Sequence, residues 1–429
     1  MNHPDSGHRP PDSLNTMWPP QVAQAWVFHF FLVCIWLCIL VNYISDLHGL
    51  FEDSGHIVGH DFINMWSGAK LALDGHVTDL FDIGRFYQAE RHFVGPLFYQ
   101  LHNWSYPPHL IPWITVIGLF SYPVALGLWT IGTFALYAFA VSYRRANPWV
   151  LTLILALAPA SFENIVSGQN GFLTAAFLVG GLRLLHARPK LAGVLFGFLT
   201  FKPHLGLMVP LALLLGRHGK VIAAALLTAL ALAALALFLY GAEPWRGFFN
   251  VTVPFQRRLL ELAPAFYLDM MPSPFAAARH LGAPTAVAYA ISIAVALYAA
   301  LLVAIASTST IKPERRDAIL LTAALLATPY SFSYDMTLLS AAVVSFLASS
   351  GGRPLPLWQT LFFALLWLSP LCVFGLNGAG VPLTPLVLLV FLVLQARELP
   401  RDAGFKISLA FLRPRNRTTP APERNQAGA

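Results

Sequence analysis

The chain has 429 residues, of which 57% are hydrophobic and only 11% are charged. Soluble domains carry about 25% charged residues, so the composition excludes an ordinary soluble protein and predicts a membrane protein. The net charge of +7 does not indicate a nucleic-acid partner, because most basic residues lie in loops on one side of the predicted membrane spans. The three cysteines lie inside apolar runs and are interpreted as packing residues.

The polar, Pro-rich residues 1–20 lack the features of a signal peptide and predict a disordered cytoplasmic N-terminus. The apolar run that follows is long enough to be an uncleaved anchor. We expect an all-α polytopic membrane domain over residues 21–400, with about 12 transmembrane helices (11 to 13), and a basic cytoplasmic tail over 401–429. The predicted spans cover residues 25–45, 122–142, 149–165, 170–186, 190–202, 204–216, 220–240, 286–307, 317–330, 335–349, 356–374 and 381–396.

Several of these spans are shorter than the ~20 residues that a full crossing needs. The fifth and sixth spans meet at Lys202-Pro203, and this pattern predicts a helical hairpin that turns within or near the bilayer. Irregular backbone at that depth is tolerated where it is buried in protein or lines a cavity.

The distribution of basic residues predicts the orientation. With a cytoplasmic N-terminus, 19 of the 27 Lys and Arg residues fall on the inside, which is the bias that the positive-inside rule describes. Two long loops, 46–121 and 241–285, are then extracytoplasmic, and we expect a multi-pass protein of the plasma membrane. In the first loop, the amphipathic segments 61–73 and 79–92 are predicted to lie along the membrane surface as interfacial helices.

Five polar clusters fall on the predicted extracytoplasmic side. Polar groups are costly at a membrane unless they serve a site, so the clusters predict one composite active site. The clusters are Gly59-His60-Asp61-Phe62, Tyr106-Pro107-Pro108, Ser167-Gly168-Gln169-Asn170, Phe201-Lys202-Pro203-His204 and Tyr330-Ser331-Phe332-Ser333-Tyr334-Asp335.

Two of these residues carry alternative interpretations. Asp61 precedes an amphipathic segment, so it could cap a helix, serve as a general base at the mouth of a cavity, or do both. Lys202 interrupts an apolar run, so its ammonium either reaches the interface by snorkelling or holds an anionic ligand. The amides of Gln169 and Asn170 suit sugar hydroxyls.

Together the clusters resemble glycosyltransferase family 87. The resemblance covers about residues 25–345 and depends on several loose motifs in the family's order. These are Asp61 to Trp66, Leu71 to Gly75, Leu80-Phe81-Asp82, Tyr106-Pro107-Pro108, Gly168-Gln169-Asn170, Lys202-Pro203 and Tyr334-Asp335. Some relatives have His in the last motif, where this chain has Tyr330 and Tyr334, so a second catalytic group and the acceptor stay open.

The resemblance implies a GT-C-like bundle and an enzyme that moves mannose or a similar sugar from a polyprenyl-phosphate donor to an acceptor hydroxyl of a glycan or glycolipid. It implies that Asp61 is catalytic, and an inverting displacement would use it as the base. Lys202, Arg257 and Arg258 are candidates for binding the donor phosphate. Candidate sugar or acceptor ligands are Gln169, Asn170, His204, Tyr330, Tyr334 and Asp335. No Asp-x-Asp motif is present, and we expect no cofactor and no obligatory metal.

Other functions fit parts of the sequence. A transporter or flippase of a lipid-linked glycan would place its binding groups near the midplane, often in repeated halves, and no repeat is evident here. A ligase that acts on lipid-linked glycans and a non-catalytic assembly subunit are further alternatives.

Overall fold

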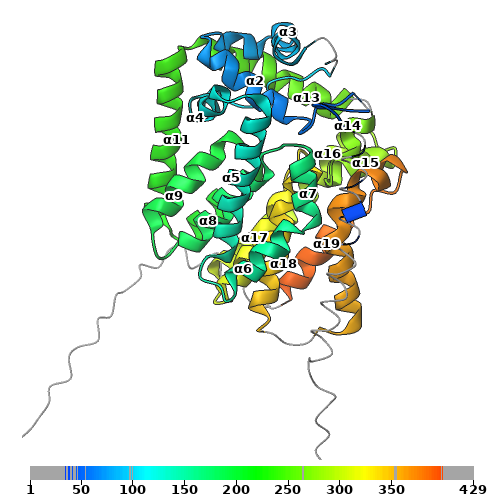
Figure 1. Cartoon of the computed structure of the whole chain (residues 1–429). Coiled ribbons are helices and arrows are strands. Elements are labelled where there is room, and N and C mark those ends of the chain that lie inside the picture. Colours follow the sequence, from blue (N-terminus) through cyan, green and yellow to red (C-terminus); the bar gives the residue numbers. More distant parts are fainter. Residues whose placement is uncertain are drawn as a thin grey trace, which may run out of the picture.

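Helices make up nearly all of the regular structure in the computed structural model (Figure 1). The structure describes residues 47–397 apart from 54, 96, 97, 99, 263, 264 and 352–354, together with residues 34, 37, 38, 41, 45 and 399. The predicted disordered N-terminus 1–20, most of the predicted anchor 25–45 and the predicted tail 401–429 lie outside the described residues.

The α-helices are α2 (Phe62–Leu73), α3 (Ile83–Val94), α4 (Ile111–Ile114), α5 (Tyr122–Ser142), α6 (Pro148–Ala156), α7 (Pro159–Val166), α8 (Gly171–Leu184), α9 (Pro189–Phe198), α10 (Met208–Leu215), α11 (Gly219–Tyr240), α12 (Glu243–Gly247), α13 (Val253–Leu262), α14 (Ala265–Asp269), α15 (Pro274–His280), α16 (Thr285–Thr308), α17 (Pro313–Leu326), α18 (Thr337–Ser349), α19 (Leu357–Gly378) and α20 (Thr384–Ala396). Short 3-10 segments are η1 (Val77–Phe81), η2 (Pro108–Leu110), η3 (Thr115–Leu119), η4 (Leu199–Phe201), η5 (Pro203–Gly206) and η7 (Ser333–Met336), and η6 (Phe248–Thr252) is a π-helix. Strands β1 (Leu47–His48) and β2 (Phe51–Glu52) form an antiparallel pair.

Every predicted span within the described residues contains helix. By length and composition, four helices in the described part of the chain are able to cross a membrane: α5, α11, α16 and α19. The bent pair of α6 and α7, with 57° between the two helices, makes a fifth if the pair is one span. The chain is therefore an almost entirely helical protein with several candidate membrane spans, and the total of about 12 stays a prediction.

Proline explains why so many apolar segments form short helices. Pro lies in the first turn of α6, α7 and α9, at Pro148, Pro159 and Pro189. Proline is tolerated there because the first backbone N–H groups of a helix have no intrahelical acceptor, whereas inside a helix it removes a hydrogen bond and clashes. Each such residue starts a new helix and changes the direction of the chain.

The hairpin predicted at Lys202-Pro203 is present. α9 and η4 lead into Lys202, and η5 and α10 lead away from it. His186 precedes this helix pair and His218 follows it, yet the centroids of their rings lie 5.3 Å apart. The chain thus returns to its starting level after turning at Lys202, which places this residue at the tip of the hairpin.

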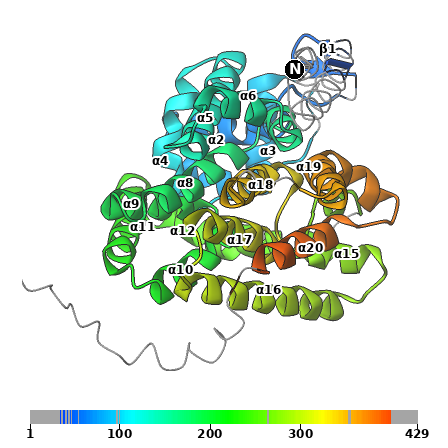
Figure 2. The ribbon, with the colours of Figure 1, turned by 90° about the horizontal axis from the view of Figure 1, so that it is seen from below.

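Burial separates central helices from peripheral ones. In α17 most side chains are buried, whereas in α11 only Val221 and Ala236 are buried. Seen from below, α17 and α18 lie toward the middle while α11 and α16 lie at the edge (Figure 2). The exposed face of α11 is apolar and includes Leu227 and Phe238, at 70% and 86% exposure. Such a face suits lipid and would be costly in water.

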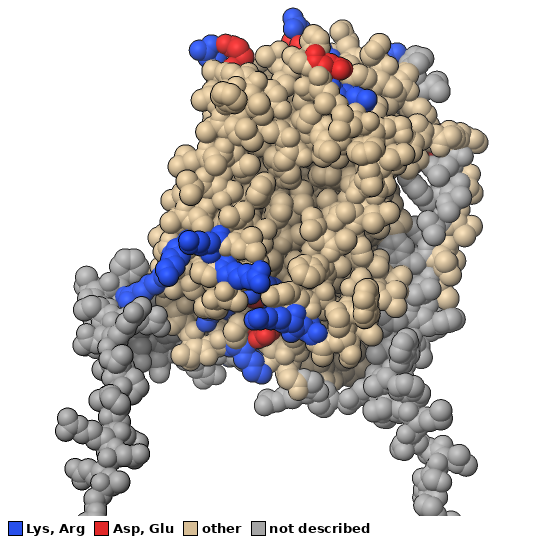
Figure 3. Space-filling view, turned by 60° about the vertical axis from the view of Figure 1, so that its left-hand side comes forward, with Lys and Arg blue, Asp and Glu red and all other residues tan. Residues whose placement is uncertain are grey.

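Charged side chains avoid the middle of the molecule. On the face drawn in Figure 3, Lys, Arg, Asp and Glu gather toward the two ends, and a broad uncharged band separates them. A bilayer core about 30 Å thick imposes this distribution on a membrane protein, because charges near its centre are costly.

The first long loop folds into a helical cap at one end of the bundle. α2 was predicted to be an interfacial helix, but it is buried on most sides, including Phe62, Ile63 and Trp66. Its small residue Gly68 admits the ring of Trp104, since a Cβ at this glycine would overlap that ring. α2 is thus the core of the cap, while α3 is amphipathic as predicted and buries only Phe86 and Glu90.

Candidate active site

Asp61 lies in the turn that leads into α2. Gly59 and His60 have positive φ values of 78° and 33°, and this tight turn brings the Asp61 backbone N–H to the carbonyl of Ser167 at 3.1 Å. Asp61 occupies the N-cap position, but its carboxylate accepts no hydrogen bond from the α2 backbone. The side chain is therefore not a helix cap, and its oxygens point elsewhere.

A glycine contact joins the first and third polar clusters. Gly168 has a φ of 60°, and a Cβ at this position would overlap the carbonyl group of Gly59. Glycine permits both the left-handed conformation and the close approach. The neighbouring Gln169 thereby reaches Asp61, and its Nε2 donates to Asp61 Oδ2 at 2.8 Å.

Tyr106 extends this contact toward the bundle. Its hydroxyl donates to Gln169 Oε1 at 3.3 Å and accepts from Asn170 Nδ2 at 2.7 Å. Gln169 and Asn170 are consecutive in one turn, and both form a hydrogen bond with the Tyr106 hydroxyl. The predicted clusters around Asp61, Tyr106 and Gln169-Asn170 are therefore connected by side-chain hydrogen bonds.

Lys202 continues the chain of contacts from the tip of the hairpin. Its Nζ donates to Asn170 Oδ1 at 3.0 Å and to Asp335 Oδ1 at 2.5 Å, and it lies 4.8 Å from the centroid of the Tyr334 ring. The Lys202 side chain is 6% exposed and that of Asp335 is fully buried. The ammonium is therefore not snorkelling to the surface, and buried ions of this kind require partners.

These contacts form one polar network, by which we mean Asp61, Gln169, Tyr106, Asn170, Lys202 and Asp335. One end of the network is closed: Asp335 is fully buried and its Oδ2 accepts from the backbone of Phe332. The other end is open, because the Asp61 side chain is 38% exposed. A polar molecule from outside would meet Asp61 first.

Two further ionisable residues lie behind Asp61. His102 Nε2 lies 3.6 Å from Asp61 Oδ1, and His102 Nδ1 lies 3.2 Å from Glu90 Oε1. Burial favours the neutral imidazole, but the two carboxylates outweigh it and raise the pKa of His102 to about 10. His102 is therefore an imidazolium at neutral pH, with an N–H directed at each carboxylate.

The same contacts act on the two carboxylates in opposite directions. Burial opposes ionisation of Asp61, yet the hydrogen bonds and charge of His102, together with the Gln169 amide, hold the pKa of Asp61 below its usual value. Glu90 is fully buried, and this burial raises its pKa. Asp61 is thus the member of the trio that is both ionised and accessible.

Comparison with known proteins identifies the family. Residues 104–329, more than half of the chain, match the model of glycosyltransferase family 87. This chain belongs to glycosyltransferase family 87. No curated protein and no solved structure matches it. The family 87 match contains Tyr106, Gln169, Asn170 and Lys202, whereas Asp61 and Asp335 lie outside the matched range. Membership and the apolar helices make the protein a membrane glycosyltransferase.

The remaining residues of the predicted site form an aromatic wall beside the polar network. His204 packs edge-on against Tyr330 with ring centroids 5.6 Å apart, and the hydroxyls of Tyr330 and Tyr267 lie 2.6 Å apart. The Tyr334 ring, which contacts Lys202, stacks on Phe332 at 5.1 Å. The second outer loop contributes Tyr267, so both long loops of the family 87 protein reach this region.

Arg257 and Arg258 lie apart from the polar network. Both are exposed on α13, and Arg257 Nε donates to Glu261 Oε1 at 2.9 Å in a surface ion pair. The neighbouring Gln256 donates to Ser105 Oγ at 2.5 Å, which anchors α13 one residue from Tyr106. The structure therefore places these arginines on the outer surface near the network, and their binding of a phosphate stays a prediction.

Sequence reasoning missed Glu90, His102 and Glu163. Glu90 follows Phe86 by four residues and so interrupts the apolar face of α3, which is a signal that the sequence contains. His102 has no such signal, because it lies in an irregular segment. Glu163, in α7, accepts from Ser333 Oγ at 3.1 Å.

Among the described residues, no three His, Cys, Asp or Glu side chains are grouped in a way that could hold a metal ion.

Proposed function

We propose that this family 87 glycosyltransferase moves mannose or a similar sugar from a polyprenyl-phosphate donor to a hydroxyl of a glycan or glycolipid acceptor. The site would face the extracytoplasmic side of the plasma membrane. The observation that carries the proposal is the state of Asp61: it is the exposed, ionised end of a buried polar network. A general base that activates the acceptor must be ionised, held in position and accessible to the acceptor hydroxyl.

The trio of Glu90, His102 and Asp61 supports Asp61 as the base. His102 is already protonated at neutral pH, so it has no free lone pair for a proton. Glu90 is fully buried behind it. Asp61 remains, and His102 together with Gln169 orients its carboxylate while leaving it partly exposed.

The proposed reaction is a single displacement. The acceptor hydroxyl donates a hydrogen bond to Asp61, and its oxygen attacks the anomeric carbon as the proton passes to the carboxylate. The bond between the anomeric carbon and the phosphate oxygen breaks, and the electron pair leaves with the phosphate. Attack opposite the leaving group inverts the configuration. Because the pKa of Asp61 is held below its usual value, the proton passes late in this displacement, when the attacking oxygen has become acidic.

A phosphate leaving group needs compensating positive charge. We propose that Lys202 binds the phosphate of the sugar donor. Its ammonium is paired with Asp335, so the phosphate must compete with that carboxylate for it. Arg257 and Arg258 are the proposed outer contacts of the phosphate, supported by the anchoring of α13 beside Ser105. Gln169, Asn170, His204, Tyr330, Tyr334 and Asp335 are the proposed groups around the sugar and the acceptor.

The test is transfer of radiolabelled sugar from a defined polyprenyl-phosphate donor into membranes that contain or lack the protein. We expect labelled product only with the protein, and a sugar linkage of inverted configuration. If the protein instead moves the intact lipid-linked sugar across a sealed vesicle membrane without releasing polyprenyl phosphate, it is a transporter and the proposal fails. Transfer of a preassembled glycan would identify a ligase.

A further inference from the structure

A second polar site lies at the end of the molecule opposite the cap. There a groove of about 640 Å³ opens between three segments that are distant in sequence: the loop between α5 and α6, the end of α8 and the start of α17. Figure 3 shows basic side chains gathered at this end. Nothing in the proposed transfer reaction uses this groove.

Three arginines line the groove: Arg144, Arg145 and Arg183. Arg145 is fixed in place, since its guanidinium donates to the Val141 carbonyl at 3.1 Å and to Ser345 Oγ at 3.3 Å. Arg144 is exposed and has a φ of 56°, a left-handed conformation that a non-glycine residue rarely adopts. The loop thus presents an exposed guanidinium beside one that is held by hydrogen bonds.

Arg183 is the deepest of the three, with a side chain that is 12% exposed. Its Nε and Nη2 atoms are buried and have no hydrogen-bond partner. The nearest carboxylate oxygen, on Asp317, lies 3.8 Å from Nη1, beyond hydrogen-bonding distance. Buried charged donors without acceptors are costly. An anion in the groove would supply the acceptors that this guanidinium lacks.

The net charge of the lining indicates how many negative charges that anion carries. The carboxylates Glu314 and Asp317 also line the groove, so the three arginines leave a net charge of one positive unit. A singly charged phosphodiester matches this balance better than a multiply charged phosphate. The planar guanidinium suits phosphate oxygens in a bidentate arrangement.

The other wall of the groove is apolar. Val150 and Ile154 on α6 face the space together with Val344 on α18, and Val150 is 57% exposed. The adjacent Trp149 is 84% exposed, as expected for an aromatic residue at a membrane interface. A ligand that fills the groove therefore has a charged head and an apolar chain.

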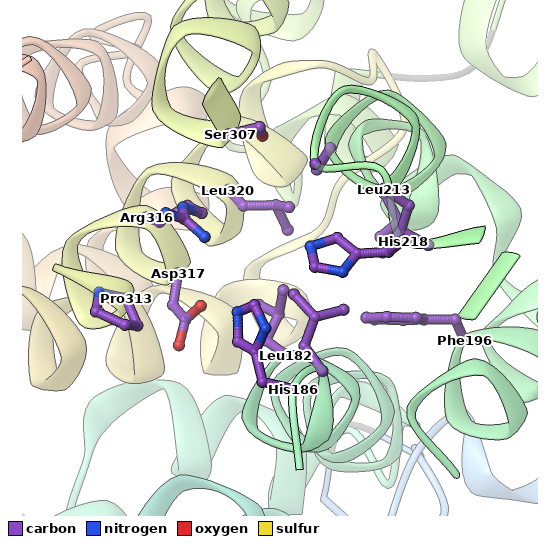
Figure 4. Close-up of a pocket in the computed structure, with 14 residues that line it drawn as sticks. Leu182, His186, Phe196, Leu213, His218, Ser307, Pro313, Arg316, Asp317 and Leu320 are labelled. Carbon is purple, nitrogen blue, oxygen red and sulfur yellow. The ribbon is translucent and has the colours of Figure 1, made fainter. Parts of the chain in front are cut away.

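The groove shares part of its lining with a smaller pocket, which is drawn in Figure 4. His186 and His218 face each other there, with Arg316 and Asp317 from α17 beside them. This pocket holds about 40 Å³, room for a few water molecules at roughly 10–15 Å³ each. A headgroup at Arg183 would thus lie beside His186, which lines both the groove and this pocket.

We propose that this groove binds an anionic membrane phospholipid, with its phosphodiester at Arg183 and Arg144 and one acyl chain along Val150 and Ile154. Basic pockets between membrane helices on the cytoplasmic side bind lipid headgroups in this way. The lipid would join α5–α6, α8 and α17 at the end of the bundle that lies away from the polar network. The proposal does not depend on the identity of the transferred sugar.

The test uses the full chain, purified in detergent and stripped of lipid. Native mass spectrometry counts bound phosphatidylglycerol, and thermal unfolding reports its effect on stability. Phosphatidylcholine and soluble glycerol-3-phosphate are the comparison ligands. We expect phosphatidylglycerol to bind and to raise the unfolding temperature, phosphatidylcholine to bind more weakly, and glycerol-3-phosphate to have little effect, because it lacks the acyl chain.

Two variants and one control locate the site. Arg183→Gln and the exposed Arg144→Gln should each weaken phosphatidylglycerol binding by about tenfold or more, the loss expected for a charged hydrogen bond. Arg188→Gln, on the same end of the molecule but not in the groove lining, should bind as the wild type does. Wild-type binding by both groove variants would overturn the proposal. Equal stabilisation by glycerol-3-phosphate would also overturn it, by indicating a site for small anions.

Discussion

Three ionisable side chains lie in a row at the mouth of the polar network, and their environments give them different tasks. Glu90 is buried, His102 bridges two carboxylates, and Asp61 is partly exposed. The arrangement resembles other active sites in which neighbouring charges fix the protonation state of each group.

Replacing Asp61 with Asn removes the proposed base and the negative charge that faces His102, while the size of the side chain is kept. Asn retains an oxygen that can accept from Gln169, and no cap hydrogen bond to α2 is lost because none exists. We expect sugar transfer to fall by about 10²–10⁴, while the unfolding temperature in detergent changes by only a few degrees. Activity within a few-fold of the wild type would remove Asp61 from the mechanism.

His102 predicts a dependence of stability on pH. Its pKa rises from 6.5 to about 10 on folding, so its contribution to stability is complete below pH 6.5 and is lost as pH rises through 10. Between these values, one extra proton on the folded state lowers the free energy of unfolding by at most about 1.4 kcal/mol per pH unit. Thermal unfolding from pH 7 to 10.5 should show a steeper decline in the wild type than in His102→Gln. Parallel curves would contradict the raised pKa.

The ion pair of Lys202 and Asp335 predicts a non-additive pair of substitutions. Lys202→Met alone leaves a buried carboxylate unpaired, which typically costs about 3–5 kcal/mol of stability. Adding Asp335→Asn should recover much of that loss, as thermal unfolding would measure. The double variant then separates folding from catalysis. If it is stable and transfers sugar with normal apparent affinity for the donor, Lys202 does not bind the phosphate.

Among the structural elements, the turn at Gly168 decides whether the polar network forms. A side chain at this position meets the Gly59 backbone and requires an unfavourable φ of 60°. Gly168→Ala should therefore move Gln169 away from Asp61, destabilise the protein by about 1–3 kcal/mol and reduce transfer. Gly132→Ala is the control, because open space surrounds that glycine in α5. Equal behaviour of the two variants would show that the contact between the turns is dispensable.

The positions of the helices agree with the apolar segments of the sequence, but many helices are shorter than a membrane span. The predicted spans at 122–142, 220–240 and 286–307 correspond to α5, α11 and α16 almost residue for residue. In these three helices the apolar run has no proline beyond the first turn, and in lipid a continuous helix is how such a run satisfies its backbone N–H and C=O groups. Elsewhere prolines divide the apolar sequence into short helices, and only packing against neighbours determines whether two such pieces form one crossing.

At the scale of the whole molecule, the positive-inside bias predicts that the cap and the groove lie on opposite sides of the membrane. In a variant without its native cysteines, Leu262→Cys should react with a membrane-impermeant maleimide in intact cells. Thr310→Cys should react only after permeabilisation. Both positions are exposed, so accessibility within the protein does not limit either reaction. The reverse pattern would invert the orientation and place the polar network in the cytoplasm.

The sequence by itself determined the class of protein, the positions of most helices and the candidates Asp61, Gln169, Asn170, Lys202 and Asp335. Composition and apolar length dictate these, and the short motifs stand out against an apolar background. Tertiary structure decided which polar groups meet. The pairing of Lys202 with Asp335, 133 residues away, depends on how the helices pack. His102 was missed for the same reason: a side chain in an irregular segment acquires its role from neighbours that the local sequence does not specify.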